Sequence, residues 1–193
     1  MNLLKAALFA AALAWGSAAL AEVAVAGVKY EEATDVRGSK LVLNGAGIRY
    51  RGPFKVYTAG LYMAKKAGTP EEALALPGAK RISITMLREI DASELGKLFT
   101  RSVEDNMEKS AFSKLIPGLM RMSQLFTDCK KLSAGDSFTI DWIPGTGTVI
   151  HVKCTQNTEP FKEPEFFNAL LRIWLGPNPA DWKLKDALLG RPA

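Results

Sequence analysis

The order of strand-like and helix-like segments predicts an α+β domain, in which helices pack on one face of an antiparallel sheet. Three observations support this fold class. Strand formers dominate residues 41–63 and 80–88, helical periodicity dominates residues 91–126, and a hairpin at 136–154 is followed by further helices. No linker long enough to separate two domains interrupts them, so we expect a single domain over residues 22–193.

The first 21 residues have the pattern of an export signal. Lys5 precedes an apolar run from Leu8 to Trp15, and Ala19-Leu20-Ala21 has the A-x-A form of a cleavage site. The run is too short to cross a bilayer as a helix, and no later stretch is long enough to do so. We therefore expect a signal peptide at residues 1–21 and a mature protein that is periplasmic or otherwise exported.

Composition excludes several classes of function. The net charge of +5 comes without an Arg/Lys run interleaved with aromatic residues, so nucleic acid is not expected as a partner. His151 is the one histidine and no Cys/His cluster exists, so we expect no metal and no cofactor. Cys129 and Cys154 form an even pair in a chain with an export signal, which favours a disulfide. Two buried free thiols are the alternative.

Residues 41–63 are expected to form two long strands joined by a turn at Gly52-Pro53, with a break or bulge at Asn44-Gly45. The second strand lacks polar alternation, which predicts cover on both faces. Arg49 ends the first strand and Thr58 lies in the middle of the second. A guanidinium beside a kinked strand can hold an anionic or carbonyl group; an exposed strand-end arginine and a strand-favouring threonine are the alternative.

The other elements follow from capping, turn and periodicity signals. They are a loose leader at 22–28, a short strand at 28–34, a helical turn after Thr69, a strand at 80–88, a helix from Asp91 to about Ser110, a helix starting at Pro117, strands at 136–143 and 148–154, and helices at 165–175 and 180–189. Asn106 lies on the apolar face of the first long helix, seven residues after Phe99. A buried amide needs a partner, which is either a backbone carbonyl or a ligand.

Four segments together resemble the chalcone isomerase family, in particular its exported bacterial members. They are residues 43–49 (LNGAGIR), 55–62 (KVYTAGLY), 99–106 and 171–176 (LRIWLG). The resemblance implies an open-faced β-sandwich, in which a large antiparallel sheet and a layer of helices enclose a cleft for a hydrophobic ligand.

In the catalytic plant members, the resemblance implies an arginine that stabilises a phenolate, a threonine and a tyrosine that order a water, and an asparagine and a threonine or serine that hold the far end of the flavonoid. Arg49, Thr58 and Asn106 match three of these positions, while Phe99 replaces the tyrosine and Ile173 replaces the threonine or serine. Phenylalanine and isoleucine cannot form the missing hydrogen bonds. Losing one contact that polarises an oxyanion costs roughly a hundredfold or more in rate.

The sequence therefore favours a non-catalytic protein that binds a small apolar acid, such as a fatty acid, as the family's non-catalytic plastid branch does. Arg49 would pair with the carboxylate, Thr58 and Asn106 would add polar contacts, and Phe99 and Ile173 would line the cleft. One alternative is an isomerase or intramolecular lyase that acts on a chalcone-like enone. A second is a structural or interaction protein whose cleft is filled by its own side chains.

Overall fold

The computed structural model describes residues 22–155 and 158–192, so the predicted signal peptide lies outside the described residues. The strands are β1 (Glu22–Val25), β2 (Val28–Glu31), β3 (Ala33–Val36), β4 (Ser39–Arg51), β5 (Phe54–Met63), β6 (Lys80–Met86), β7 (Ile90–Asp91), β8 (Lys131–Leu132), β9 (Ser137–Ile143) and β10 (Gly147–Val152). The helices are α1 (Pro70–Ala75), α2 (Ala92–Glu104), α3 (Lys109–Thr127), α4 (Pro164–Leu175) and α5 (Trp182–Leu188). In this part of the chain, no helix combines the length and hydropathy needed to span a membrane.

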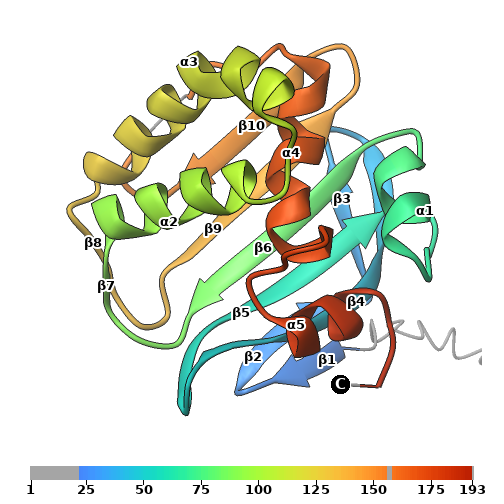
Figure 1. The fold of residues 1–193 in the computed structure, drawn as a ribbon. Coiled ribbons are helices and arrows are strands. Elements are labelled where there is room, and N and C mark those ends of the chain that lie inside the picture. The colour runs from blue at the N-terminus through green and yellow to red at the C-terminus, as the bar shows by residue number, and fades with distance from the viewer. Residues whose placement is uncertain (1–21, 156–157, 193) are drawn as a thin grey trace, which may run out of the picture.

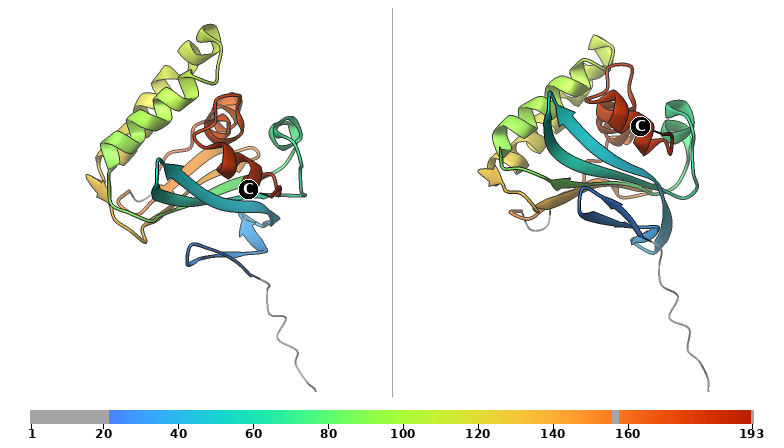
Figure 2. Two further views of the ribbon diagram at one scale, coloured as in Figure 1. Left: turned by 60° about the horizontal axis from the view of Figure 1, so that its bottom comes forward. Right: turned by 90° about the horizontal axis from the view of Figure 1, so that it is seen from below.

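The main sheet is antiparallel, with strand order β10-β9-β6-β5-β4-β3, and its helices gather on one face (Figure 1). The β1–β2 hairpin lies on the other side of the sheet from the helices (Figure 2). The predicted α+β architecture, a large antiparallel sheet with a layer of helices, is confirmed.

Side chains of β5 enter two separate cores, because successive residues of a strand point to opposite faces. Tyr57 and Leu61 belong to the large core beneath the helices, whereas Tyr62 packs with Tyr30 in a smaller core under the β1–β2 hairpin. Both faces are therefore covered, which explains why the strand shows no alternation between apolar and polar residues.

Two irregularities interrupt the β4–β5 ladder. The pairing passes from Leu43–Tyr62 to Gly45–Leu61, which leaves Asn44 as the extra residue of a bulge at the predicted position. The buried Asn44 side chain accepts the N–H of Ala67 at 2.7 Å and donates to the carbonyls of Ala67 and Leu188, at 3.0 and 2.7 Å. The bulge thereby fastens the C-terminal helix α5 to the sheet.

The glycines of β4 let α5 lie directly on the strand. A Cβ at Gly47 would stand 2.6 Å from the Cβ of Ala187, and one at Gly45 would stand 2.0 Å from the Ala187 carbonyl oxygen. Neither distance is possible for real atoms, so a side chain at either glycine would displace α5. The N-terminus of α5 is held as well, because the Asp181 carboxylate accepts the N–H of Tyr50 at 2.8 Å.

The N-terminal segment expected as a loose leader is instead strand β1, paired antiparallel with β2 from Glu22–Glu31 to Val25–Val28. The turn between them is made by Ala26 and Gly27, whose φ angles are 50° and 83°. Positive φ at both positions is what a two-residue type I′ hairpin requires. The prediction missed this hairpin because Ala-Gly is a weak turn signal.

The predicted boundary between the two long helices is also wrong. The first helix ends at Glu104, and α3 begins at Lys109, so Pro117 lies inside α3 and not at its start. Proline removes one hydrogen bond donor from the helix and leaves the carbonyl of Ser113 without its usual partner. Ser113 and Pro117 are both exposed, so water can bond this carbonyl.

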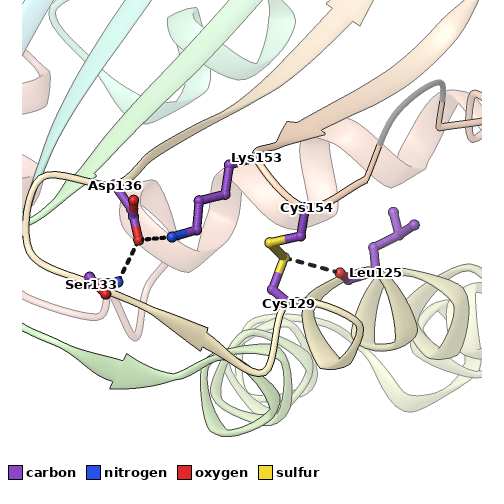
Figure 3. The surroundings of a disulfide bond; sticks show 6 residues. All are labelled: Leu125, Cys129, Ser133, Asp136, Lys153 and Cys154. Carbon is purple, nitrogen blue, oxygen red and sulfur yellow. Dashed lines mark hydrogen bonds and ion pairs between the residues drawn. A yellow bond between two sulfur atoms is a disulfide. The ribbon is translucent and has the colours of Figure 1, made fainter.

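Cys129 and Cys154 are joined as a disulfide, with their Cα atoms 5.2 Å apart (Figure 3). The bond links the C-terminal end of α3 to the end of β10. Nearby, the Asp136 carboxylate pairs with Lys153 and accepts the N–H of Ser133 at 2.6 Å. The β9–β10 hairpin is thereby attached to the helix layer at this end of the molecule.

Candidate functional site

Arg49 and Tyr57 are cross-strand neighbours on the helix-covered face of the sheet. The guanidinium carbon of Arg49 lies 5.6 Å from the centre of the Tyr57 ring, which is cation–π distance. Arg49 is half-buried, whereas only 1% of Tyr57 is exposed. The pair therefore forms the polar end of an otherwise apolar interior.

The Tyr57 hydroxyl accepts a hydrogen bond of 2.9 Å from the indole N–H of Trp174 on α4. Burial raises the pKa of Tyr57 to about 12, although the positive charge of Arg49 and the bond from Trp174 act in the opposite direction. The hydroxyl is therefore protonated at neutral pH. Within the described chain its hydrogen has no acceptor, so it can be donated to a ligand.

Arg49 also lacks a hydrogen-bond or ion-pair partner among the described residues. Among the described residues, no carboxylate lies within 4.0 Å of its guanidinium and no acceptor bonds it. Asp181 acts electrostatically on the same tyrosine, but its oxygens already accept the N–H groups of Tyr50, Lys183 and Leu184. Arg49 and Tyr57 thus offer neighbouring donors, a combination that suits a carboxylate.

Thr58 does not join this pair. Its cross-strand neighbour is Ile48, and its hydroxyl oxygen accepts the Tyr30 hydroxyl at 2.8 Å, on the face covered by the β1–β2 hairpin. Thr58 is fully buried there and lies 3.5 Å from the carbonyl oxygen of Thr85. The expectation that Thr58 and Arg49 act together in one cleft is therefore corrected: they project from opposite faces of the sheet.

Phe99 packs in an aromatic cluster where the resemblance places the catalytic tyrosine. Its ring centre lies 5.8 Å from that of Phe126, 6.2 Å from that of Phe138 and 5.5 Å from that of Trp174. All four side chains are buried, and Ile173 is buried in the same core with 1% exposed. These side chains fill the space between sheet and helices.

Asn106 has a structural partner for every amide atom. Its Nδ2 donates to the carbonyls of Ser102 at 2.8 Å and Asn178 at 2.9 Å, and its Oδ1 accepts the N–H of Asn178 at 2.8 Å. Gly176 follows α4 here, and a Cβ at this position would stand 2.2 Å from Oδ1. Asn106 therefore joins the end of α2 to the turn after α4, and both of its N–H donors are bound within the chain.

The predicted residues do not line any of the five prominent hollows found in the described chain. The more prominent surface hollows of the described part of the chain include five of about 330 to 670 Å³, and none of these five is lined by the predicted set, namely Arg49, Thr58, Phe99, Asn106 and Ile173. Within residues 22–155 and 158–192, no group of three or more His, Cys, Asp or Glu side chains is arranged so that it could hold a metal ion. The chemistry available at this site is that of the Arg49–Tyr57 pair.

Tyr57 is the site residue that the sequence did not single out as functional. In a regular hairpin that starts from the Arg51–Phe54 pair, Arg49 would face Val56, and Thr58 would lie on the same face. The actual pairing passes from Tyr50–Lys55 to Arg49–Tyr57 and leaves Val56 as an extra residue. Because of this bulge, Tyr57 and not Thr58 shares a face of the sheet with Arg49. No glycine lies at the bulge on β5, so the sequence carries no signal for it.

Replacing Tyr57 by Phe is expected to reduce the loss of stability at alkaline pH. An unfolded tyrosine releases its proton near pH 10, whereas folded Tyr57 retains it to about pH 12, so the free energy of unfolding falls as the pH rises between these values. One pKa unit corresponds to about 1.4 kcal/mol, so the contribution of Tyr57 is about 3 kcal/mol. Urea unfolding across this pH range measures it. Equal losses in both proteins would show that Tyr57 titrates normally.

The comparisons with known proteins agree with this fold. A model of the family described as chalcone isomerase-like matches residues 22–190. The crystal structure of a fatty-acid binding protein of Arabidopsis thaliana superposes with a TM-score of 0.66 at 17% sequence identity, covering 84% of this chain and 92% of that one. A search among curated proteins finds no match. Because the family model spans nearly the whole of the described chain, the protein belongs to the chalcone isomerase-like family.

Proposed function

We propose that this protein binds a small apolar carboxylic acid, such as a fatty acid, without catalysing a reaction on it. One observation carries the proposal: the half-buried Arg49 guanidinium has no carboxylate partner in the described chain and lies 5.6 Å from the ring centre of buried Tyr57, whose hydroxyl hydrogen has no acceptor there. A carboxylate would accept hydrogen bonds from both groups, and its apolar part would lie along Trp174 and Phe99. The similar plant structure is that of a fatty-acid binding protein, which supports the same class of ligand.

Entry of such a ligand requires the helices to move. Phe99, Trp174 and their aromatic neighbours are in contact, and interiors as dense as this leave no room for an alkyl chain. Trp174 of α4 bonds Tyr57, and α5 lies on β4 against Gly45 and Gly47, so displacement of these helices from the sheet would open the site.

The packed aromatic cluster also favours a second candidate, an interaction protein whose cleft is permanently filled. In that case Arg49 would be only a polar side chain near the end of the strand, with no ligand to bind. The enzyme alternative receives less support, because Thr58 lies on the other face of the sheet and Phe99 carries no hydroxyl.

Titration calorimetry with dodecanoate and with dodecanol tests the proposal. The wild type is expected to prefer the acid. Arg49→Met is expected to weaken dodecanoate binding about ten- to a hundredfold and to abolish this preference, because it removes hydrogen bonds to a charged group. Arg51→Met is the matched control, since Arg51 lies two residues away in an exposed position and its loss changes the net charge equally.

Three outcomes would contradict the proposal. Unchanged affinity in Arg49→Met would show that the acid binds elsewhere. No binding by the wild type, together with no acid in organic extracts of the purified protein, would favour the filled-cleft interaction protein. Turnover of a chalcone that is lost in Arg49→Met would establish an isomerase.

A further inference from the structure

Three aromatic side chains are exposed around the β4–β5 hairpin and the start of α5, outside the interior site; Tyr50 and Phe54 project from opposite faces of the hairpin. Tyr50 and Phe54 belong to the β4–β5 hairpin, and Trp182 begins α5; their exposed fractions are 37%, 59% and 62%. Tyr50 and Trp182 line one hollow of about 650 Å³. Phe54 lies at the hairpin tip, which extends away from the neighbouring strands (Figure 1). Exposed large apolar side chains that gather in this way indicate an interaction surface.

Cations alternate with these aromatic residues. Lys55 is the cross-strand neighbour of Tyr50, and Arg51 is that of Phe54. The Arg88 guanidinium carbon lies 5.2 Å from the centre of the Phe54 ring. Lys183 lines the same hollow as Trp182. We call these seven residues the hairpin surface: Tyr50, Arg51, Phe54, Lys55, Arg88, Trp182 and Lys183.

The nearby carboxylates offset only part of this positive charge. Asp181 is occupied by the N–H of Tyr50 and by the first turn of α5, and Glu89 pairs with Lys131 at 2.9 Å. Within the described residues, none of the four cations of the hairpin surface lies in an ion pair. The four cations outnumber Asp181, the carboxylate that lines the same hollow, so the hairpin surface presents net positive charge together with aromatic side chains.

We propose that the hairpin surface docks the protein onto a bilayer that contains anionic phospholipid. Trp and Tyr side chains prefer the headgroup region of a bilayer, because an apolar ring and a polar atom are both accommodated there. Lys and Arg side chains gain about fivefold in affinity each beside an anionic leaflet. Phe54, at the tip of the hairpin, would enter the acyl boundary.

A bilayer fits better than a nucleic acid or a protein groove. The cations are grouped around a protruding tip and do not form the extended track that a phosphate backbone requires. The tip is convex and would meet a flat, anionic surface. Docking on the bilayer does not require a bound acid. If the proposed function also holds, docking would bring Arg49, the neighbour of Tyr50, close to a source of apolar acids.

Vesicle flotation tests this proposal without any added acid. The chain from residue 22, which contains every described element, is mixed with phosphatidylcholine vesicles that hold either no anionic lipid or about 30 per cent phosphatidylglycerol. The wild type is expected to float with the anionic vesicles only, to be released by salt, and to show a blue shift in the fluorescence of exposed Trp182. Arg51→Glu/Lys55→Glu should reduce binding at least twenty-fivefold, and Phe54→Ser should reduce it several-fold.

Lys109→Glu/Lys114→Glu is the matched control, because it reverses two exposed charges at the start of α3. It is expected to bind as the wild type does. An equal loss of vesicle binding in this control would show that binding depends only on net charge, and the proposal would be wrong. It would also be wrong if the wild type did not bind the anionic vesicles. Sedimentation completes the test: a dimer that dissociates in Phe54→Ser would show that the hairpin surface contacts a second copy, and the proposal would be wrong.

Discussion

Replacing Arg81 by Met is expected to lower the free energy of unfolding by about 3–5 kcal/mol, because it leaves a buried carboxylate without its partner. The Arg81 guanidinium donates to both oxygens of Asp141, at 2.7 and 2.6 Å, and only 1% of the Asp141 side chain is exposed. His151 lies 3.7 Å from the same carboxylate, too far to replace the two bonds. Urea unfolding at neutral pH gives the difference.

The double variant Arg81→Met/Asp141→Leu is the control for this prediction. It removes both charges and restores apolar contacts, so most of the lost stability should return. A single variant as stable as the wild type would mean that water reaches Asp141 and that the ion pair contributes little.

Replacing both cysteines by alanine is expected to lower the free energy of unfolding by about 3.5 kcal/mol, the chain-entropy value for a loop of this length. The disulfide closes a loop with a sequence separation of 25 residues between the end of α3 and the end of β10. The closure restricts the unfolded chain more than the folded one, so its loss favours unfolding. Urea unfolding of Cys129→Ala/Cys154→Ala against the oxidised wild type measures the effect.

Reductant gives an independent check of the same bond. Cys154 is exposed, so a small thiol can reach the disulfide in the folded protein. Dithiothreitol should shift the wild-type midpoint towards that of the double variant and leave the variant unchanged. Equal midpoints for oxidised and reduced wild type would show that the link does not stabilise the fold.

Much of the fold can be predicted from local patterns, because caps, turns and periodicity act between residues close in sequence. Thr69 accepts the N–H of Glu72, and Asp91 accepts that of Glu94, as their spacing predicts. Gly176 ends α4 as predicted. The predictions failed where local signals were weak or ambiguous: the Ala26-Gly27 turn, and Pro117, which is compatible with both the first turn and the exposed interior of a helix.

The candidate site was predictable only in part. Arg49 could be found from its place after the glycines of the kinked first strand. Asn106 posed a choice between a backbone partner and a ligand, which depended on where the turn after α4 lies in space. Phe99 and Ile173 were expected to line a cleft, but packing against distant aromatic side chains fills that space.

The sequence by itself determined the order of the main elements from β4 onward, the α+β class and the two long strands that carry Arg49 and its partner. Only the tertiary structure decided which hydroxyl accompanies Arg49. Side chains alternate between the faces of a strand, so a shift of one residue moves every side chain to the other face. The extra residue at Val56 makes that shift: it brings Tyr57 beside Arg49 under the helices and turns Thr58 towards Tyr30 on the opposite face.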